Sequence, residues 1–291
     1  MNFNQYLESR NYSIKTIESY HKSLAIFLQW LNDENINEIN TTYNDMMAFI
    51  RSRTDAGNSK EYVQKQLSVV RHYFNYLVRI KKVKDNITAN INIKGIKRRL
   101  PHDILSVEEL EQIYNGYNVN GIIGKRNKVI LGLMIYQGIG TEDLGKLEEI
   151  HLKLNESKIY IPARRRSNNR TLDLLPEQVI LLQDYITKTR HLILELTAKE
   201  THLLFTSWGS SERFSNMQAV ILRNIKRYMP QVKSINQIRI SVIAEWVKKY
   251  NLREAQYRAG HRYVGSTELY QQTNMEDLKK DVKAYHPFKN K

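Results

Sequence analysis

The sequence predicts a mainly α-helical protein of two domains, with one small antiparallel β-sheet in the second domain. Three observations support this prediction. Apolar residues recur at helical spacing through most of the chain. The spacing of apolar residues changes to the alternation typical of strands only between residues 151 and 174. The length of 291 residues exceeds that of an ordinary domain, which is roughly 100 to 200 residues.

The composition is that of a globular protein. Hydrophobic residues make up 41% of the chain and aromatic residues 10%, which is enough to build cores. The chain has no cysteine, which excludes disulfides, a thiol nucleophile and cysteine-ligated zinc. The longest apolar run, Val129 to Tyr136, is far shorter than the roughly 18 residues of a membrane span. Because the N-terminus also lacks a signal-peptide pattern, we expect a cytoplasmic protein without membrane contact.

The charge balance favours a nucleic acid partner. Lys and Arg number 45 against 30 Asp and Glu, a net charge of +15 with a pI near 9.7. Residues 1–92 hold 12 basic and 9 acidic residues, so the remaining 33 basic and 21 acidic residues follow them. The excess therefore lies mostly in the second domain, although a basic surface can also serve only solubility.

Residues 1–90 are predicted to form a small helical domain. An amphipathic helix follows the capping residue Ser13, a second spans Tyr43–Arg53, and a third spans Ser59–Ile80. The loop Thr54–Asn58 separates the second from the third. Basic side chains of the third helix lie off its apolar stripe, where they face either a DNA groove or only water: Lys60, Lys65 and Arg71.

Residues 91–102 are predicted to form a basic linker, because they are polar, then basic, and show no sustained helical pattern. Their cations would attract phosphate, or else the segment is simply solvated; they are Lys94, Lys97, Arg98 and Arg99. The second domain, 103–291, begins with a helix whose capping box is Ser106 and Glu109.

The second domain is predicted to alternate helices with one group of strands. A buried helix, 126–137, ends at the turn Gly138–Gly140, and a short helix follows from Thr141. The predicted strands are His151–Leu154, Lys158–Pro162 and Arg170–Leu174. The predicted later helices are Pro176–Thr189, Met217–Tyr228, Ser241–Tyr250, Leu252–Ala259 and Glu276–Tyr285.

Three residues between 239 and 270 suggest phosphoryl-transfer chemistry. Arg239, near a helix start, can hold two phosphate oxygens with its planar guanidinium. His261 can donate a hydrogen bond to another oxygen, and the phenol of Tyr270 can attack phosphorus. Taken singly, these residues also fit an ion pair, a turn cap and a packed aromatic side chain.

This segment, GHRYVGSTELY with the preceding Arg239, resembles the C-terminal motif of the tyrosine recombinases of the phage-integrase and Xer type. The resemblance spans the chain: YLESRNYSIKTIESYHKSLAIFLQWL resembles the core-binding domain of that family, and KGIKRRLPHDILSVEELEQI resembles the linker and the entry to its catalytic domain. It implies a helical, SAM-like core-binding domain followed by an α+β catalytic domain.

The resemblance also implies a function. Catalytic residues would be Tyr270, Arg239 and His261, acting on double-stranded DNA through a 3′-phosphotyrosine without cofactor or metal. The tail from Glu276 to Pro287 resembles the segment that contacts a neighbouring protomer. The expected partners are therefore DNA and further recombinase protomers, copies of this chain or a partner enzyme, in a tetrameric synapse.

The catalytic set departs from the family pattern. Gly140 stands where the family has the first phosphate-clamping arginine, and Arg165 stands where it has the hairpin lysine. Asn236 and Ile240 replace the two histidines that flank the second arginine. Arg164 and Arg166 beside Arg165 would also bind DNA, and any of the three arginines can restore charge, although arginine does not transfer a proton near neutral pH.

Two hypotheses follow. The chain is a recombinase or integrase of a mobile element with atypical or partner-dependent activity, or it is a catalytically impaired paralogue that acts as a DNA-binding accessory or regulatory protein. Loss of a charged donor to a phosphorane costs on the order of 10² to 10³ in rate. Active-site losses are not additive, so the sequence leaves both hypotheses open.

Overall fold

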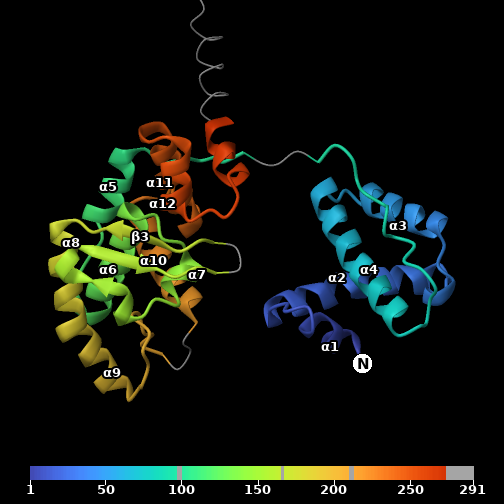
Figure 1. Cartoon of the computed structure of the whole chain (residues 1–291), viewed down its shortest axis with the longest axis horizontal. Coiled ribbons are helices and arrows are strands. Elements are labelled where there is room, and N and C mark those ends of the chain that lie inside the picture. Colours follow the sequence, from blue (N-terminus) through green and yellow to red (C-terminus); the bar gives the residue numbers. More distant parts are fainter. Residues whose placement is uncertain (97–99, 165–166, 210–212, 273–291) are drawn as a thin grey trace, which may run out of the picture. The chain divides into compact units, whose positions relative to one another are not determined.

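The computed structural model describes residues 1–96, 100–164, 167–209 and 213–272. The chain divides into two compact units, Met1–Arg98 and Arg99–Lys291. Both are mainly helical, and the second contains a small antiparallel sheet, which confirms the predicted fold class (Figure 1). Within the described ranges, every helix is too short or too polar to cross a membrane.

Unit 1 contains the three predicted helices and one more. These are α2 (Ile14–Asp33), α3 (Tyr43–Asp55) and α4 (Lys60–Arg79), each preceded by a Ser or Thr whose hydroxyl accepts a backbone N–H of the first turn. The additional helix, α1 (Phe3–Glu8), is too short for a periodic apolar pattern to reveal it. A 3₁₀ turn, η1 (Glu38–Asn40), precedes α3.

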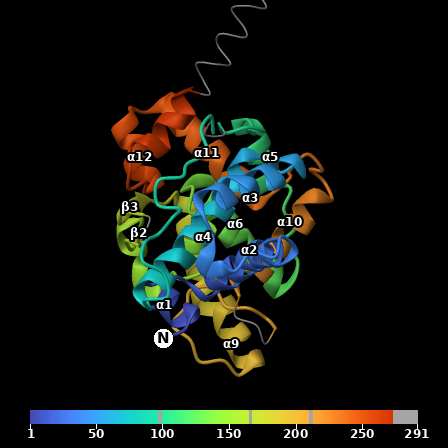
Figure 2. The same ribbon diagram turned by 90° about the vertical axis from the view of Figure 1, so that its right-hand side faces the viewer.

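The core of unit 1 is aromatic. Helices α2 and α4 lie side by side (Figures 1 and 2). The ring of Phe27 makes edge-to-face contacts with the rings of Phe49 and Phe74. The chain after α4 folds back onto that helix: Ile91 is buried, and the backbone N–H of Ile93 donates to Gln64 at 2.8 Å. The first residues of the predicted linker therefore pack against unit 1.

Unit 2 contains further helices among its described residues: α5 (Val107–Asn115), α6 (Gly121–Tyr136), α7 (Thr141–Leu144), α8 (Pro176–Asp184), the π-helical η4 (Tyr185–Arg190), α9 (His191–Thr197), α10 (Phe214–Lys226), α11 (Ile235–Lys249) and α12 (Leu252–Ala259). Residues 265–272 are also helical. The predicted start of α11 at Ser241 is wrong, because Ser234 caps a helix that begins at Ile235. The predicted helix Glu276–Tyr285 lies outside the described residues.

The sheet consists of β1 (Leu152–Lys153), β2 (Lys158–Ile161) and β3 (Arg170–Asp173), antiparallel and in that order. Ile159 pairs with Leu172, and both are buried, so one face of the sheet covers the core. Strand β1 is shorter than predicted because 3₁₀ turns, η2 (Glu149–His151) and η3 (Leu154–Glu156), flank it.

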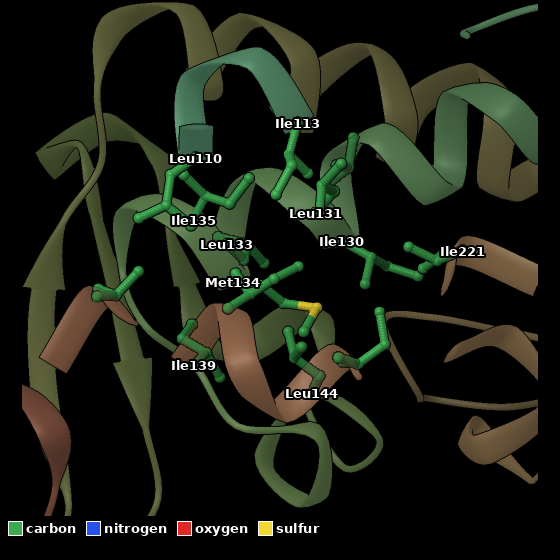
Figure 3. Close-up of a cluster of buried hydrophobic side chains, with 14 of the residues drawn as sticks. Leu110, Ile113, Ile130, Leu131, Leu133, Met134, Ile135, Ile139, Leu144 and Ile221 are labelled. Atoms are coloured by element: carbon green, nitrogen blue, oxygen red, sulfur yellow. The ribbon is translucent and has the colours of Figure 1, made fainter. Parts of the chain in front are cut away.

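Helix α6 lies at the centre of the unit 2 core (Figure 3). Its residues from Val129 to Ile135 are apolar and all buried, which is typical of a helical segment surrounded by other elements. Leu110 and Ile113 of α5 and Ile221 of α10 belong to the same cluster. Ile139 and Leu144 anchor the turn after α6 in this core, so the backbone from Gly138 to α7 is held in place.

Candidate active site

The structure brings the three predicted catalytic residues together. Arg239 lies in the second turn of α11, His261 directly follows α12, and Tyr270 lies in the helical residues 265–272. Gly260 ends α12 in the left-handed conformation, with φ of +67°, which redirects the chain toward the β2–β3 hairpin. The rings of His261 and Tyr270 then stack with centroids 6.3 Å apart.

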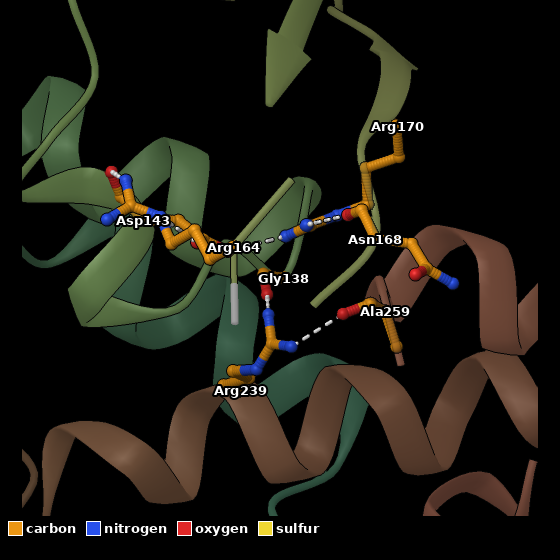
Figure 4. A network of polar contacts seen from close by, with 7 residues as sticks. All are labelled: Gly138, Asp143, Arg164, Asn168, Arg170, Arg239 and Ala259. Carbon is orange, nitrogen blue, oxygen red and sulfur yellow. Dashed lines mark hydrogen bonds and ion pairs between the residues drawn. The ribbon is translucent and has the colours of Figure 1, made fainter. Parts of the chain in front are cut away.

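Arg239 is held between two backbone carbonyls, as Figure 4 shows. Its guanidinium donates to the carbonyl oxygens of Gly138 and Ala259, the latter at 2.6 Å from Nη2. Burial and the charge of Arg170 lower the pKa of Arg239 to about 10, against the opposite influence of Asp143 and Tyr270. Arg239 thus remains a cation at neutral pH and lies within electrostatic range of the phenol.

A second group of charges surrounds Asp143, the buried carboxylate of α7. Its Oδ2 pairs with Nη2 of Arg170 at 3.0 Å, and its Oδ1 pairs with Nε of Arg164 at 2.9 Å. Arg170 on β3 is completely buried, whereas the Arg164 side chain is 18% exposed. In the sequence, Arg170 is only the first residue of a predicted strand and Asp143 carries no signal, because an ion pair between residues 27 positions apart has no local pattern.

His261 is positioned by a buried threonine. Its Nδ1 lies 2.9 Å from Oγ1 of Thr267, which follows it by six residues in the sequence. Burial, followed by the charges of Arg239 and Arg170, lowers the pKa of His261 to about 4. The imidazole is therefore neutral near pH 7, and it can donate one hydrogen bond but cannot supply a full positive charge.

Tyr270 is only 9% exposed. Burial raises the pKa of its phenol, and the nearby Arg239 offsets part of that increase. The phenol is therefore protonated at neutral pH, and it would have to lose its proton in order to act as a nucleophile. A cation beside it stabilises the charge that develops on its oxygen.

The atypical positions fall around the same site. Gly140 is the N-cap of α7, and a Cβ there would lie 3.5 Å from Cδ and Nε of Arg239, which is ordinary contact. Asn236 is exposed near the start of α11, and Ile240 packs against the core. Arg165 and Arg166 lie outside the described residues.

The predicted DNA-binding residues of unit 1 differ in their surroundings. Lys60, Lys65 and Lys94 are exposed. Arg71 instead donates to the carbonyl oxygens of Thr88, at 3.2 Å, and Ile91, so its guanidinium fastens the chain after α4. Lys97, Arg98 and Arg99 lie outside the described residues.

The two units and this site define a class of protein: a helical N-terminal domain followed by an α+β domain in which Arg, His and Tyr converge. Residues 1–81 match the family model described as "Phage integrase, N-terminal SAM-like domain". The chain is 22% identical to tyrosine recombinase XerC of Bacillus pumilus, over 98% of this chain and 95% of that protein. It is 24% identical to tyrosine recombinase XerD of Proteus mirabilis, over 97% and 92%.

Solved structures share the fold. The XerH site-specific recombinase bound to a palindromic difH substrate in a post-cleavage complex matches with a TM-score of 0.75 at 17% identity, over 97% of this chain and 83% of that one. The Tn1549 transposon integrase in complex with a circular intermediate DNA matches with a TM-score of 0.66 at 11% identity, over 94% and 98%. The chain thus resembles tyrosine recombinases over nearly its whole length, and these solved structures share its fold.

Proposed function

We propose that this protein breaks and rejoins DNA strands through a covalent 3′-phosphotyrosine at Tyr270. The observation that supports this most directly is the convergence of Tyr270, stacked on His261, with the buried cation of Arg239. No single one of these residues would suggest a covalent mechanism, but a phenol beside a fixed cation and a neutral hydrogen-bond donor suits attack on a phosphodiester.

The proposed reaction forms one P–O bond for each P–O bond that it breaks. The Tyr270 oxygen attacks the scissile phosphorus, a P–O bond to Tyr270 forms, and the P–O bond to the 5′ oxygen breaks. The phenol loses a proton and the leaving 5′ oxygen gains one. Attack of another strand's 5′ hydroxyl on the phosphotyrosine reverses these events and joins that strand, so no nucleotide energy source is required.

The proposed substrate is duplex DNA. The chain carries a net charge of +15, and its exposed lysines in unit 1 and the arginines near the site would contact phosphates of both strands. XerH and the Tn1549 integrase, which share the fold, were solved in complex with DNA. Assembly on DNA with further protomers, copies of this chain or a partner recombinase in a tetrameric synapse, completes the proposal.

We further propose that the chain is the recombinase of a mobile element and that its activity is atypical. Gly140 supplies no guanidinium, Asn236 and Ile240 supply no imidazole, and Arg165 cannot act as an acid near neutral pH. Because these changes concern charge and proton transfer rather than the nucleophile, we expect slow cleavage that a partner protomer accelerates. Arg164, Arg166, Lys97, Arg98 and Arg99 would add phosphate contacts.

A second candidate function is that of a DNA-binding accessory protein that does not cut. The observation that favours it is the state of Arg239, whose donors are directed at the carbonyl oxygens of Gly138 and Ala259. These two hydrogen bonds fix the direction of the guanidinium, so in this second function Arg239 holds the fold together rather than a phosphate.

A trapping experiment separates the two candidates. Duplexes that the protein binds would be selected from a random-sequence pool and prepared with a nick beside the target step, so that a short 5′-hydroxyl fragment is lost after cleavage. A covalent adduct on a denaturing gel that disappears in Tyr270→Phe supports the recombinase. Tyr263→Phe is the matched control, because Tyr263 is 70% exposed in the same segment. Salt-sensitive binding without adduct supports the accessory protein.

A further inference from the structure

We propose that Arg164 supplies the second guanidinium that holds the scissile phosphate, in place of the side chain that Gly140 lacks. This inference rests on the proposed function, because it assigns a role within the same site. It identifies one of the three consecutive hairpin arginines as a catalytic residue and gives Asp143 the task of positioning it.

The described residues of the site hold more positive than negative charge. Among the described residues of the site, Arg164 and Arg170 both pair with one buried carboxylate, Asp143, and Arg239 lies within electrostatic range of it (Figure 4). One carboxylate neutralises one cation, so the site retains about two positive charges. Such an excess is unfavourable in a buried site unless an anion binds there, and a phosphodiester in its phosphorane-like transition state carries the matching negative charge.

The Arg164 guanidinium is accessible to a bound phosphate. Arg170 is completely buried, with Nη2 on Asp143, and the guanidinium of Arg239 is directed at two carbonyls. Arg164 has an exposed fraction of 18% and uses Nε and Nη2 on Asp143 and its backbone oxygen. A guanidinium offers five N–H donors, so Arg164 can keep its bond to Asp143 while it donates to a phosphate oxygen.

Arg164 also contacts the short helix that begins after Gly140. Asp143 lies in α7, the four-residue helix whose N-cap is Gly140. Arg164, from the β2–β3 connection, therefore brings its guanidinium to the same short helix that Gly140 begins. The end of the β2–β3 hairpin is joined to the segment that carries His261 and Tyr270. Ser167 forms a β-bridge with His261, and the backbone N–H of Asn168 donates to the carbonyl oxygen of Gly260 at 3.0 Å. Arg164, His261 and Tyr270 thus belong to one connected unit.

The test measures single-turnover cleavage of the nicked duplex and, separately, the salt dependence of binding. Arg164→Ala should slow adduct formation by about 10²-fold to 10³-fold, and Arg164→Lys should restore part of that loss. Arg253→Ala is the matched control, because Arg253 is an exposed arginine on α12 of the same unit. Its cleavage rate should stay within about threefold of the wild type.

A second-site change distinguishes catalysis from folding. Gly140→Arg should raise the rate of Arg164→Ala by about 10-fold or more, because a guanidinium at either position reaches the same phosphate. Gly140 has a φ of −75°, and a Cβ there makes only ordinary contact with Arg239, so the backbone accepts a side chain at this position. Unchanged cleavage in Arg164→Ala, or a loss that Gly140→Arg does not relieve, would overturn the inference.

Binding gives a readout that does not require cleavage. Removing one phosphate contact lowers the slope of log K against log salt concentration by about 0.9. If the wild type forms no adduct yet Arg164→Ala lowers this slope, the proposed cleavage fails while the phosphate contact of Arg164 stands. If neither the slope nor the cleavage changes, the assignment of Arg164 fails.

Discussion

The guanidinium of Arg170 occupies the space that a side chain on Gly260 would fill. A Cβ at Gly260 would lie 2.8 Å from Cζ of Arg170, closer than such atoms approach in proteins, and the φ of +67° also favours glycine. The end of α12, which carries His261 into the site, thus packs directly against the buried cation of β3. Stability and site geometry are coupled at this contact.

Gly260→Ala should destabilise unit 2 by roughly 2 to 4 kcal/mol. Arg170 cannot move aside cheaply, because it is completely buried and paired with Asp143. Thermal and urea unfolding would measure the effect. Gly209→Ala is the control, since a Cβ there meets nothing within 4 Å. Equal stability of the two variants would show that the contact is not tight in solution.

Asp143→Ala should cost roughly 3 to 5 kcal/mol, because it leaves the buried guanidinium of Arg170 without its carboxylate. Asp184→Ala removes an aspartate whose pairs with Lys125 and Lys188 are exposed, so it should leave the free energy of unfolding nearly unchanged. Denaturant unfolding of both variants provides the comparison. A cost for Asp143→Ala as small as that of Asp184→Ala would contradict the buried ion pair.

His261 should make the free energy of unfolding depend on pH between about 4 and 6.5. Burial and the charges of Arg239 and Arg170 lower its folded-state pKa to about 4 from an ordinary 6.5. The unfolded chain binds a proton in that window and the folded chain does not, so stability is full above pH 6.5 and decreases as the pH falls.

The decrease is expected to reach at most about 3 kcal/mol near pH 4. Unfolding of the wild type and of His261→Gln at several pH values would isolate it, because the difference between the two removes the contribution of other groups. Parallel curves for the two proteins would show that His261 titrates normally.

Thr267→Val should slow cleavage with little loss of fold. We expect Thr267 to donate to Nδ1 of His261, since the hydroxyl lies 2.9 Å away, which leaves the imidazole proton on Nε2. Valine preserves the volume but removes this hydrogen bond, so the tautomer is no longer fixed and the rate falls about 10-fold to 100-fold. Nitrogen-15 NMR of the imidazole and the trapping rate measure both effects. Thr267→Ser should restore the tautomer, and its failure to do so would argue against this role.

Replacing Lys60, Lys65 and Lys94 by alanine should weaken DNA binding uniformly and lower the salt slope by about 0.9 for each lost phosphate contact. The control replaces Lys81, Lys82 and Lys84, which are also exposed in unit 1. Fluorescence anisotropy over a salt series measures both sets. A similar slope change in the control set would indicate that binding depends on net charge alone.

Arg71→Ala should act differently, by lowering the melting temperature of unit 1. Its guanidinium binds the carbonyl oxygens of Thr88 and Ile91 and so holds the chain after α4. Loss of these charged hydrogen bonds costs about 1.5 to 3 kcal/mol. A normal melting temperature with reduced DNA affinity would instead place Arg71 at the DNA.

The amphipathic helices of unit 1 and the helix, hairpin and helix order of unit 2 could be predicted from the sequence, because capping residues and apolar spacing are local. Ser13 and Ser106 were predicted to cap helices, and the structure confirms both. Short elements such as α1, and the start of α11, were missed or misplaced, since a few residues give no reliable period.

The sequence alone singled out the candidate catalytic residues: Arg239, His261 and Tyr270 were predicted from their type and order along the chain. Only the tertiary structure decided their state. It paired Asp143 with Arg170 and Arg164, placed Thr267 against His261, and buried the arginines that lower the pKa of that histidine. The physical reason is that residue type and local spacing are properties of neighbouring positions, whereas burial and charge pairing depend on segments that meet only after the chain has folded.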